Sequence, residues 1–288
     1  MIATTTAPRH LEPAALRRLG ELCGITTWPV VLDLWPVDDD ETAHAHSAAA
    51  LDRVLDQCGV LTAGAPTVWT DTVLSVLARP DHELEIRRFA SGSVVRATLA
   101  RRGHDHVLAV RDGEVIELQV LDVVDAGTLG AVVRRLCGPH PPMDFGEVSV
   151  PTRELGERFG TCTDAAAVTA ALRSWGATPS DAVRVADAFY SAGARWEIVA
   201  ATRTGGTLIQ TSGAIGIIDS GAGRILMGLS ASPDARLWTT ITPGSGYRIG
   251  QAVIRLIETL PGQRWFGMSG GIPRQQRHRG EISAYPAG

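Results

Sequence analysis

One stretch decides the fold, ARWEIVAATRTGGTLIQTSGAIGIIDSGAGRILMGLSASPDARLWTTI, residues 194–241. Val, Ile, Thr, Leu and Trp dominate it, and these residues favour β-strands. Short breaks divide it, and SGAG at 220–223 predicts a hairpin because glycine takes positive φ at no steric cost. SPD at 232–234 predicts a second turn. The pattern indicates four strands, with an amphipathic helix following over residues 247–260.

The same unit occurs earlier in the chain. LEI at 84–86 corresponds to WEI at 196–198, and each triplet precedes a Gly-marked turn. An apolar strand is predicted after each turn, over residues 94–100 and 207–218. Both units end in similar helical stretches, LGAVVRRL at 129–136 and IGQAVIRLI at 249–257. The spacing between corresponding residues grows from 112 at the glutamates to 121 at Val132 and Val253, so the second copy has longer loops. A repeat this divergent indicates one pseudo-symmetric domain.

Composition excludes several classes of protein. The chain has 288 residues, 44% hydrophobic and 20% charged, which are globular values. Its net charge of -4 gives no reason to expect a nucleic-acid partner. The N-terminus lacks an apolar signal core, and no run of about 18 apolar residues occurs, so no membrane insertion is expected. The four cysteines are scattered, and we expect a cytoplasmic protein with reduced thiols.

The order of elements predicts an α+β fold in a single domain over residues 11–266. Its halves are expected at about 11–138 and 143–266, joined by a proline-rich connector. A strand is predicted over residues 28–35, and residues 147–150 are its candidate repeat. We expect a flexible N-terminus over residues 1–10 and a disordered tail over 267–288, where Gly, Arg, Gln and Pro accumulate.

Motifs for catalysis are weak. GMSGG at 267–271 matches the nucleophile pattern G-x-S-x-G, but that turn needs a strand before it and a helix after it. A helix precedes Ser269 here and a polar tail follows. The pair His104 and His106 lacks a third metal ligand, and no Walker A or G-x-G-x-x-G sequence is present. We therefore expect no catalytic residue, cofactor or metal, and the strand-rich chain favours a binding platform.

A set of short motifs, in this order along residues 16–266, resembles the EspG-type chaperones of mycobacterial type VII (ESX) secretion systems. The motifs are WP at 28–29 before an apolar run, GVL at 59–61, the hairpin from RR at 101–102 to DG at 112–113, WEIV at 196–199, IIDS at 217–220, GRIL at 223–226, PGS at 243–245, and LP at 260–261 before Trp265.

The resemblance implies two pseudo-symmetric halves, a central mostly antiparallel β-sheet and two helical bundles. It implies a chaperone that binds the exposed tip of PPE proteins in PE–PPE heterodimers in the cytosol and keeps them soluble. The chaperone then directs them to the secretion system, without a cofactor. The sheet and the C-terminal bundle would contact the tip. Homodimerisation of the unloaded chaperone, the cognate PE–PPE pair and the ESX system stay open.

The second sheet unit carries few charges and is the candidate client-binding surface. Leu208, Gln210 and Ser212 alternate onto one face of a strand, with Ile209 and Thr211 on the other. Tryptophan and arginine often anchor interfaces, although two core tryptophans and a solubilising arginine are the alternative. The candidate partner-binding residues are Trp196, Leu208, Gln210, Ser212, Arg224, Leu226 and Trp238. Two other functions are weighed against the chaperone, a hydrolase of unrecognised mechanism and a homodimeric structural protein.

Overall fold

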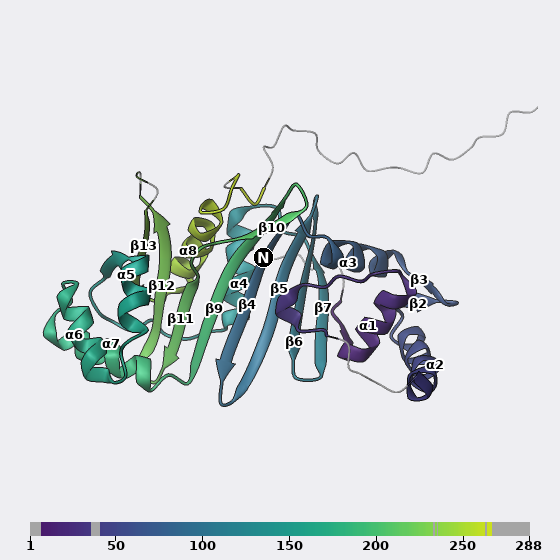
Figure 1. The fold of residues 1–288 in the computed structure, drawn as a ribbon, viewed down its shortest axis with the longest axis horizontal. Coiled ribbons are helices and arrows are strands. Elements are labelled where there is room, and N and C mark those ends of the chain that lie inside the picture. The colour runs from purple at the N-terminus through teal and green to yellow at the C-terminus, as the bar shows by residue number, and fades with distance from the viewer. Residues whose placement is uncertain (1–6, 36–40, 233, 235, 263, 267–288) are drawn as a thin grey trace, which may run out of the picture.

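A computed structural model describes residues 7–35, 41–232, 234, 236–262 and 264–266. The chain forms one long sheet with a group of helices at each end (Figure 1). The α+β class, the antiparallel sheet and the two helical bundles are confirmed. The expected disordered tail and Ser269 lie outside the described residues, as do residues 1–6.

Within the described residues, eleven strands share one sheet in the order β1-β7-β6-β5-β4-β9-β11-β12-β13-β8, with β10 paired to β9 off this path. All of these ladders are antiparallel. The strands are β1 (Arg9–Leu11), β4 (His82–Ala90), β5 (Ser93–Arg102), β6 (Asp105–Asp112), β7 (Val115–Leu121), β8 (Val148–Pro151), β9 (Ala194–Thr204), β10 (Thr207–Gln210), β11 (Ile215–Ser220), β12 (Gly223–Ala231) and β13 (Leu237–Pro243). A separate ribbon joins β2 (Leu61–Thr62) to β3 (Ala65–Pro66).

The strand order is the same from either edge to the middle. A short strand pairs with the last strand of a meander, and the two meanders meet where β4 pairs with β9. In that ladder Ile86 lies opposite Ile198, and these two residues also correspond in the sequence repeat, 112 positions apart. The register therefore agrees with a pseudo-two-fold axis through this pair.

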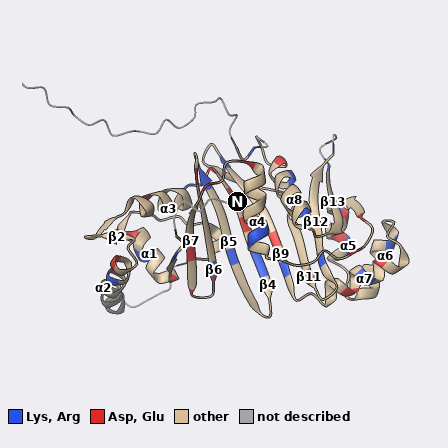
Figure 2. Cartoon of the chain, turned by 180° about the vertical axis from the view of Figure 1, so that it is seen from behind, with Lys and Arg blue, Asp and Glu red and all other residues tan. Residues whose placement is uncertain are grey.

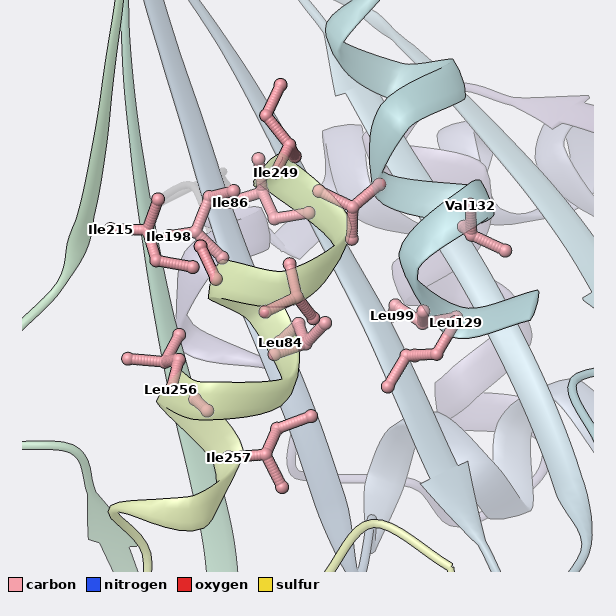
Figure 3. Close-up of a cluster of buried hydrophobic side chains, with 14 of the residues drawn as sticks. Leu84, Ile86, Leu99, Leu129, Val132, Ile198, Ile215, Ile249, Leu256 and Ile257 are labelled. Carbon is pink, nitrogen blue, oxygen red and sulfur yellow. The ribbon is translucent and has the colours of Figure 1, made fainter. Parts of the chain in front are cut away.

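Two helices cover one side of the sheet, which we call the back face. They are α4 (Ala126–Cys137) and α8 (Gly246–Glu258), which follow the two meanders and lie in front of the strands in Figure 2. Figure 3 shows their apolar side chains pointing onto the central strands. The labelled residues of this buried cluster are Leu84, Ile86, Leu99, Leu129, Val132, Ile198, Ile215, Ile249, Leu256 and Ile257.

The opposite side, the front face, carries the other helices at its two ends. Near β5 to β7 lie α1 (Pro13–Leu22), α2 (Glu41–Gln57) and α3 (Val68–Ala78), whose core includes Ala100 and Val107. Near β11 to β13 lie α5 (Thr152–Phe159), α6 (Ala165–Ser174) and α7 (Pro179–Tyr190), whose core includes Ile218 and Ile241. Because strand residues alternate between faces, the neighbours of these core residues point to the back-face helices.

Among the described residues, none of the helices has the length and the apolar character that a membrane span requires.

Three sequence-based predictions are corrected. The stretch 28–35 is not a strand; it contains a short 3-10 helix (Val30–Leu32), preceded by Pro29, which has no backbone N–H to donate, and ended by Asp33 at φ 55. The single strand expected over residues 207–218 is two strands, because the chain breaks around Gly213. Arg9 and His10 pair with β7, so the flexible segment expected over residues 1–10 does not reach them. The stretch 147–150 does form a strand, β8, but it does not repeat residues 28–35, which are not a strand; the strand in the matching outer position of the sheet is β1.

The two back-face helices touch at a pair of glycines. A Cβ added at Gly130 would lie 2.9 Å from the Cα of Gly250, closer than real Cβ contacts come. A Cβ added at Gly250 would lie 3.8 Å from the Cα of Gly130, which is ordinary van der Waals contact. Each glycine is second in its helical stretch, and the two are 120 positions apart, one fewer than Val132 and Val253. The helices therefore cross at a contact that tolerates a methyl group on one side only.

We expect Gly130→Ala to lower the free energy of unfolding by about 1–3 kcal/mol, because the clash is with backbone and the helices must separate. Gly250→Ala is the matched control. It should be neutral or stabilising by up to about 1 kcal/mol, since alanine favours helix over glycine. Chemical denaturation followed by circular dichroism measures both. Equal effects of the two substitutions would contradict the one-sided contact.

Candidate functional site

The candidate partner-binding residues divide between the two faces of the sheet. On β10, Leu208 lies opposite Arg203 and Gln210 opposite Ala201, and these β9 residues point to the front face. Opposed residues of an antiparallel pair share a face, so the shared face predicted for Leu208 and Gln210 agrees with the register. The back-face members are Trp196, Arg224, Leu226 and Trp238, according to the alternation along β9, β12 and β13.

Arg224 belongs to a buried network. Its side chain is 3% exposed, and Nη2 donates to Oδ2 of Asp219 at 2.8 Å. The same guanidinium donates to the carbonyl oxygens of Cys137 and Gly138, at 2.8 Å and 3.1 Å, and so holds the C-terminal end of α4. Nε1 of Trp196 donates to Asp219 at 3.2 Å.

Burial raises the pKa of Asp219, but hydrogen bonds and the charge of Arg224 outweigh it and hold that pKa below its usual value. The ion pair therefore stays charged at neutral pH. Trp196 and Leu226 are 8% and 2% exposed. The structure thus favours the core interpretation for Trp196, Arg224 and Leu226, while Trp238 is half-buried.

On the front face, β10 is tied to the centre of the sheet. Nε2 of Gln210 donates to Oε1 of Glu85 at 3.1 Å, and Glu85 is 1% exposed. Arg87 lies 3.7 Å from Glu85 and 3.3 Å from Glu197, so it links β4 to β9. Gln210 itself is exposed and Leu208 is half-buried. The strand therefore presents a partly apolar, partly amide surface on a charged support.

A hollow of about 740 Å³ lies beside the end of β10, between α5 and β13. Ser212 lines it from the loop after β10, together with Thr152 from α5 and Leu237 from β13. Arg153 and Arg236 also line it, and their side chains are 89% and 78% exposed. A concave surface with one apolar wall and exposed cations can receive a protruding segment of another protein. Sequence reasoning found Ser212 alone, because the other walls meet it only in the folded chain.

A buried carboxyl group lies next to this surface. Glu83 is 3% exposed on the front face of β4, two residues from Glu85. Within the described residues, Oε2 of Glu83 and Oγ1 of the buried Thr98 have no hydrogen-bond partner. Burial, followed by the charge of Glu85, raises the pKa of Glu83 to about 7. A substantial fraction of Glu83 is therefore protonated near neutral pH.

The histidine pair considered as a metal site has a structural contact instead. Nε1 of Trp265 donates to Nε2 of the buried His106 at 3.1 Å. Burial lowers the pKa of His106 to about 4, so the ring is neutral and accepts this bond. In the part of the chain that the structure describes, no group of three or more His, Cys, Asp or Glu residues could hold a metal ion.

Comparisons with known proteins agree on one family. The model of the EspG family matches residues 12–255. The chain is 32% identical over 246 residues to ESX-1 secretion-associated protein EspG1 of Mycobacterium tuberculosis, covering 84% of this chain and 83% of the relative. It is 28% identical over 251 residues to ESX-3 secretion-associated protein EspG3 of Mycolicibacterium smegmatis, covering 86% and 85%.

The fold also matches a solved structure. The Mycobacterium tuberculosis type VII secretion system chaperone EspG5, determined in complex with the PE25-PPE41 dimer, superposes with a TM-score of 0.76. The superposition covers 90% of this chain and 99% of EspG5 at 20% identity, which establishes likeness of fold.

We expect Glu83→Gln to stabilise the fold above pH 7 by up to about 3 kcal/mol. A carboxyl whose pKa rises on folding, here from 4.5 to about 7, takes up protons in the folded state. Wild-type stability should therefore fall as pH rises from about 4.5 to 7, and stay low above that.

Thermal unfolding from pH 4.5 to 8.5 measures this. The variant should lose the downward slope, while Glu114→Gln, an exposed hairpin residue, should keep it. An unchanged slope in Glu83→Gln would assign the pH dependence to other groups.

Proposed function

The chain belongs to the EspG family, and we propose that it is a cytosolic chaperone that binds the tip of a PPE protein in a PE–PPE heterodimer. In this role it keeps the dimer soluble and directs it to a type VII (ESX) secretion system. Two similarities support the proposal, the relatives named for ESX secretion and the EspG5 fold solved with a PE–PPE dimer. No catalytic residue or cofactor takes part, and the working unit is residues 11–266 with halves at about 11–138 and 143–266.

The observation that carries the proposed site is the hollow beside β10. Ser212 lines it, and Leu208 and Gln210 precede Ser212 on the front face. The hollow lies against α5 of the C-terminal helical group, so a client there would contact both the sheet and the helices. Leu237 offers apolar contact and the two exposed arginines offer a polar rim, which is the usual anatomy of a protein interface.

The client-binding set is therefore narrower than the seven residues taken from sequence. Leu208, Gln210 and Ser212 remain in it, and the hollow adds Thr152 and Leu237. Trp196, Arg224 and Leu226 support the site from the interior by fixing β11 and β12. Trp238 lies on the back face and has no place in this proposal. Self-association of the unloaded chaperone is compatible with the site, since a second copy would compete with the client.

We expect Ser212→Arg to weaken client binding at least tenfold while the fold survives. Ser212 is exposed, so the longer side chain can be accommodated in the free protein but fills the hollow and adds a third cation. Co-purification with a co-expressed PE–PPE dimer measures binding, and circular dichroism checks folding. Val115→Arg is the matched control, because Val115 is 49% exposed on a first-half strand. Equal binding by both variants and wild type would remove the hollow from the interface.

Arginine substitutions at Thr98 and Gln210 are less informative tests of client binding than Ser212→Arg. Thr98 is fully buried, so Thr98→Arg would unfold the sheet and cannot serve as a control. Gln210→Arg would place a cation near Glu85, where the amide now lies 3.1 Å from the carboxylate, so the new charge gains an ion pair.

A further inference from the structure

A second hollow, half-open and about 300 Å³ in volume, lies on the back face beside the end of α4. Its walls are mainly apolar side chains of four strands and one helix, among them Ile86, Val95, Ala97, Val110 and Leu136. We call this the α4 cavity. It lies on the opposite side of the sheet from β10, so its occupant is separate from the proposed client.

The repeat explains why this place is empty. In the second half, Leu260 extends the apolar face beyond α8 and is buried in the central cluster, 3% exposed. The corresponding position in the first half, seven residues after Val132, is Pro139, which is exposed. Gly138, at φ 68, turns the chain away there, and Arg224 holds its carbonyl oxygen at 3.1 Å. The first half therefore has no apolar side chain at this position to pack against the sheet, as Leu260 does in the second half.

The floor of the α4 cavity is a row of small and branched residues. Ile86 of β4 lies opposite Ala97 of β5, which lies opposite Val110 of β6. Alanine in the middle of this row leaves a depression between two larger neighbours, and Leu136 of α4 borders the same space. An unbranched hydrocarbon chain suits the α4 cavity, because it gains dispersion contacts with these side chains and carries no polar group that would need a hydrogen-bond partner there.

One wall of the cavity carries a cation. Arg88 lies opposite Trp196 in the β4–β9 ladder, and its guanidinium carbon is 5.5 Å from the centre of the indole ring. Trp196 is held in turn by Asp219 through Nε1. Within the described residues, the guanidinium has no carboxylate partner. An arginine positioned on an aromatic face, with its donors free, is suited to bind a carboxylate.

We propose that the α4 cavity binds an unbranched aliphatic monocarboxylate of medium chain length. Arg88 binds the carboxylate, and the hydrocarbon tail lies along Ala97 and Val110 beneath Leu136. Cys137 also lines the cavity, but burial raises the pKa of its thiol to about 12, so it stays protonated and contributes packing only. The volume lies at the lower end of the range for small-molecule sites.

The test is calorimetric titration of the full chain with decanoate and with 1-decanol, both below the concentrations at which they aggregate. We expect saturable one-to-one binding of decanoate, at least tenfold tighter than 1-decanol, because only the acid pairs with Arg88. Arg88→Gln should reduce decanoate affinity to that of the alcohol and leave alcohol affinity unchanged. Arg96→Gln, on the front face of the neighbouring strand where it pairs with Asp33, is the matched control and should bind both like wild type.

A cavity-filling variant tests the tail. Ala97→Leu should abolish binding of both compounds while circular dichroism stays unchanged; if it does not fold, the decision rests on Arg88→Gln. Absence of saturable decanoate binding to the wild type would overturn the proposal. So would equal losses in Arg88→Gln and Arg96→Gln. Client co-purification should be unaffected by Arg88→Gln, which keeps this result independent of the proposed chaperone function.

Discussion

The close contact of α4 and α8 is the constraint on which the architecture depends. The two helices approach to the point where only glycine fits at position 130, and they do so over the strands that join the halves. The central cluster holds Ile86 and Ile198 from the sheet together with the apolar faces of both helices. Both contacts therefore lie where the two halves of the chain meet, one within the sheet and one in the helices that cover it. The two outer helical groups are then free to differ, because each packs on its own end of the front face.

Much of this fold could be predicted from sequence, since it depends on local signals. Hairpin glycines and strand alternation act within a few residues, and the structure agrees with them. The strand predicted over residues 28–35 was wrong because the apolar run there resembles a strand. In the structure Pro29 precedes the run and Asp33, in the left-handed region, ends it, and the residues between them form a 3-10 helix. The break at Gly213 was missed for a different reason. The break depends on β10 pairing with β9, and the sequence of a strand does not specify which other strand it pairs with.

Only part of the candidate client-binding site could be predicted from the sequence. Alternation placed Leu208 and Gln210 on one face, because side-chain direction in a strand has period two. Residue type alone misled for Trp196 and Arg224, since interface anchors and buried network members are the same amino acids. The walls of the hollow come from three separate segments, residues 151–156, 212 and 236–237, and a single sequence carries no signal that joins them. The two proposed sites lie on opposite faces of one sheet, the client surface on the front face and the α4 cavity on the back face.

The seam between β4 and β9 has a consequence for the order in which the chain folds as it leaves the ribosome. The first meander and α4 are complete at Cys137, but β9 ends only at Thr204. At roughly 5–20 residues per second, the edge of β4 waits on the order of several seconds for its partner. During that interval a row of unpaired backbone groups is exposed, together with apolar residues such as Ile86 that α8 will later help to cover. A chain of this design therefore passes through a nascent state that itself needs protection from aggregation.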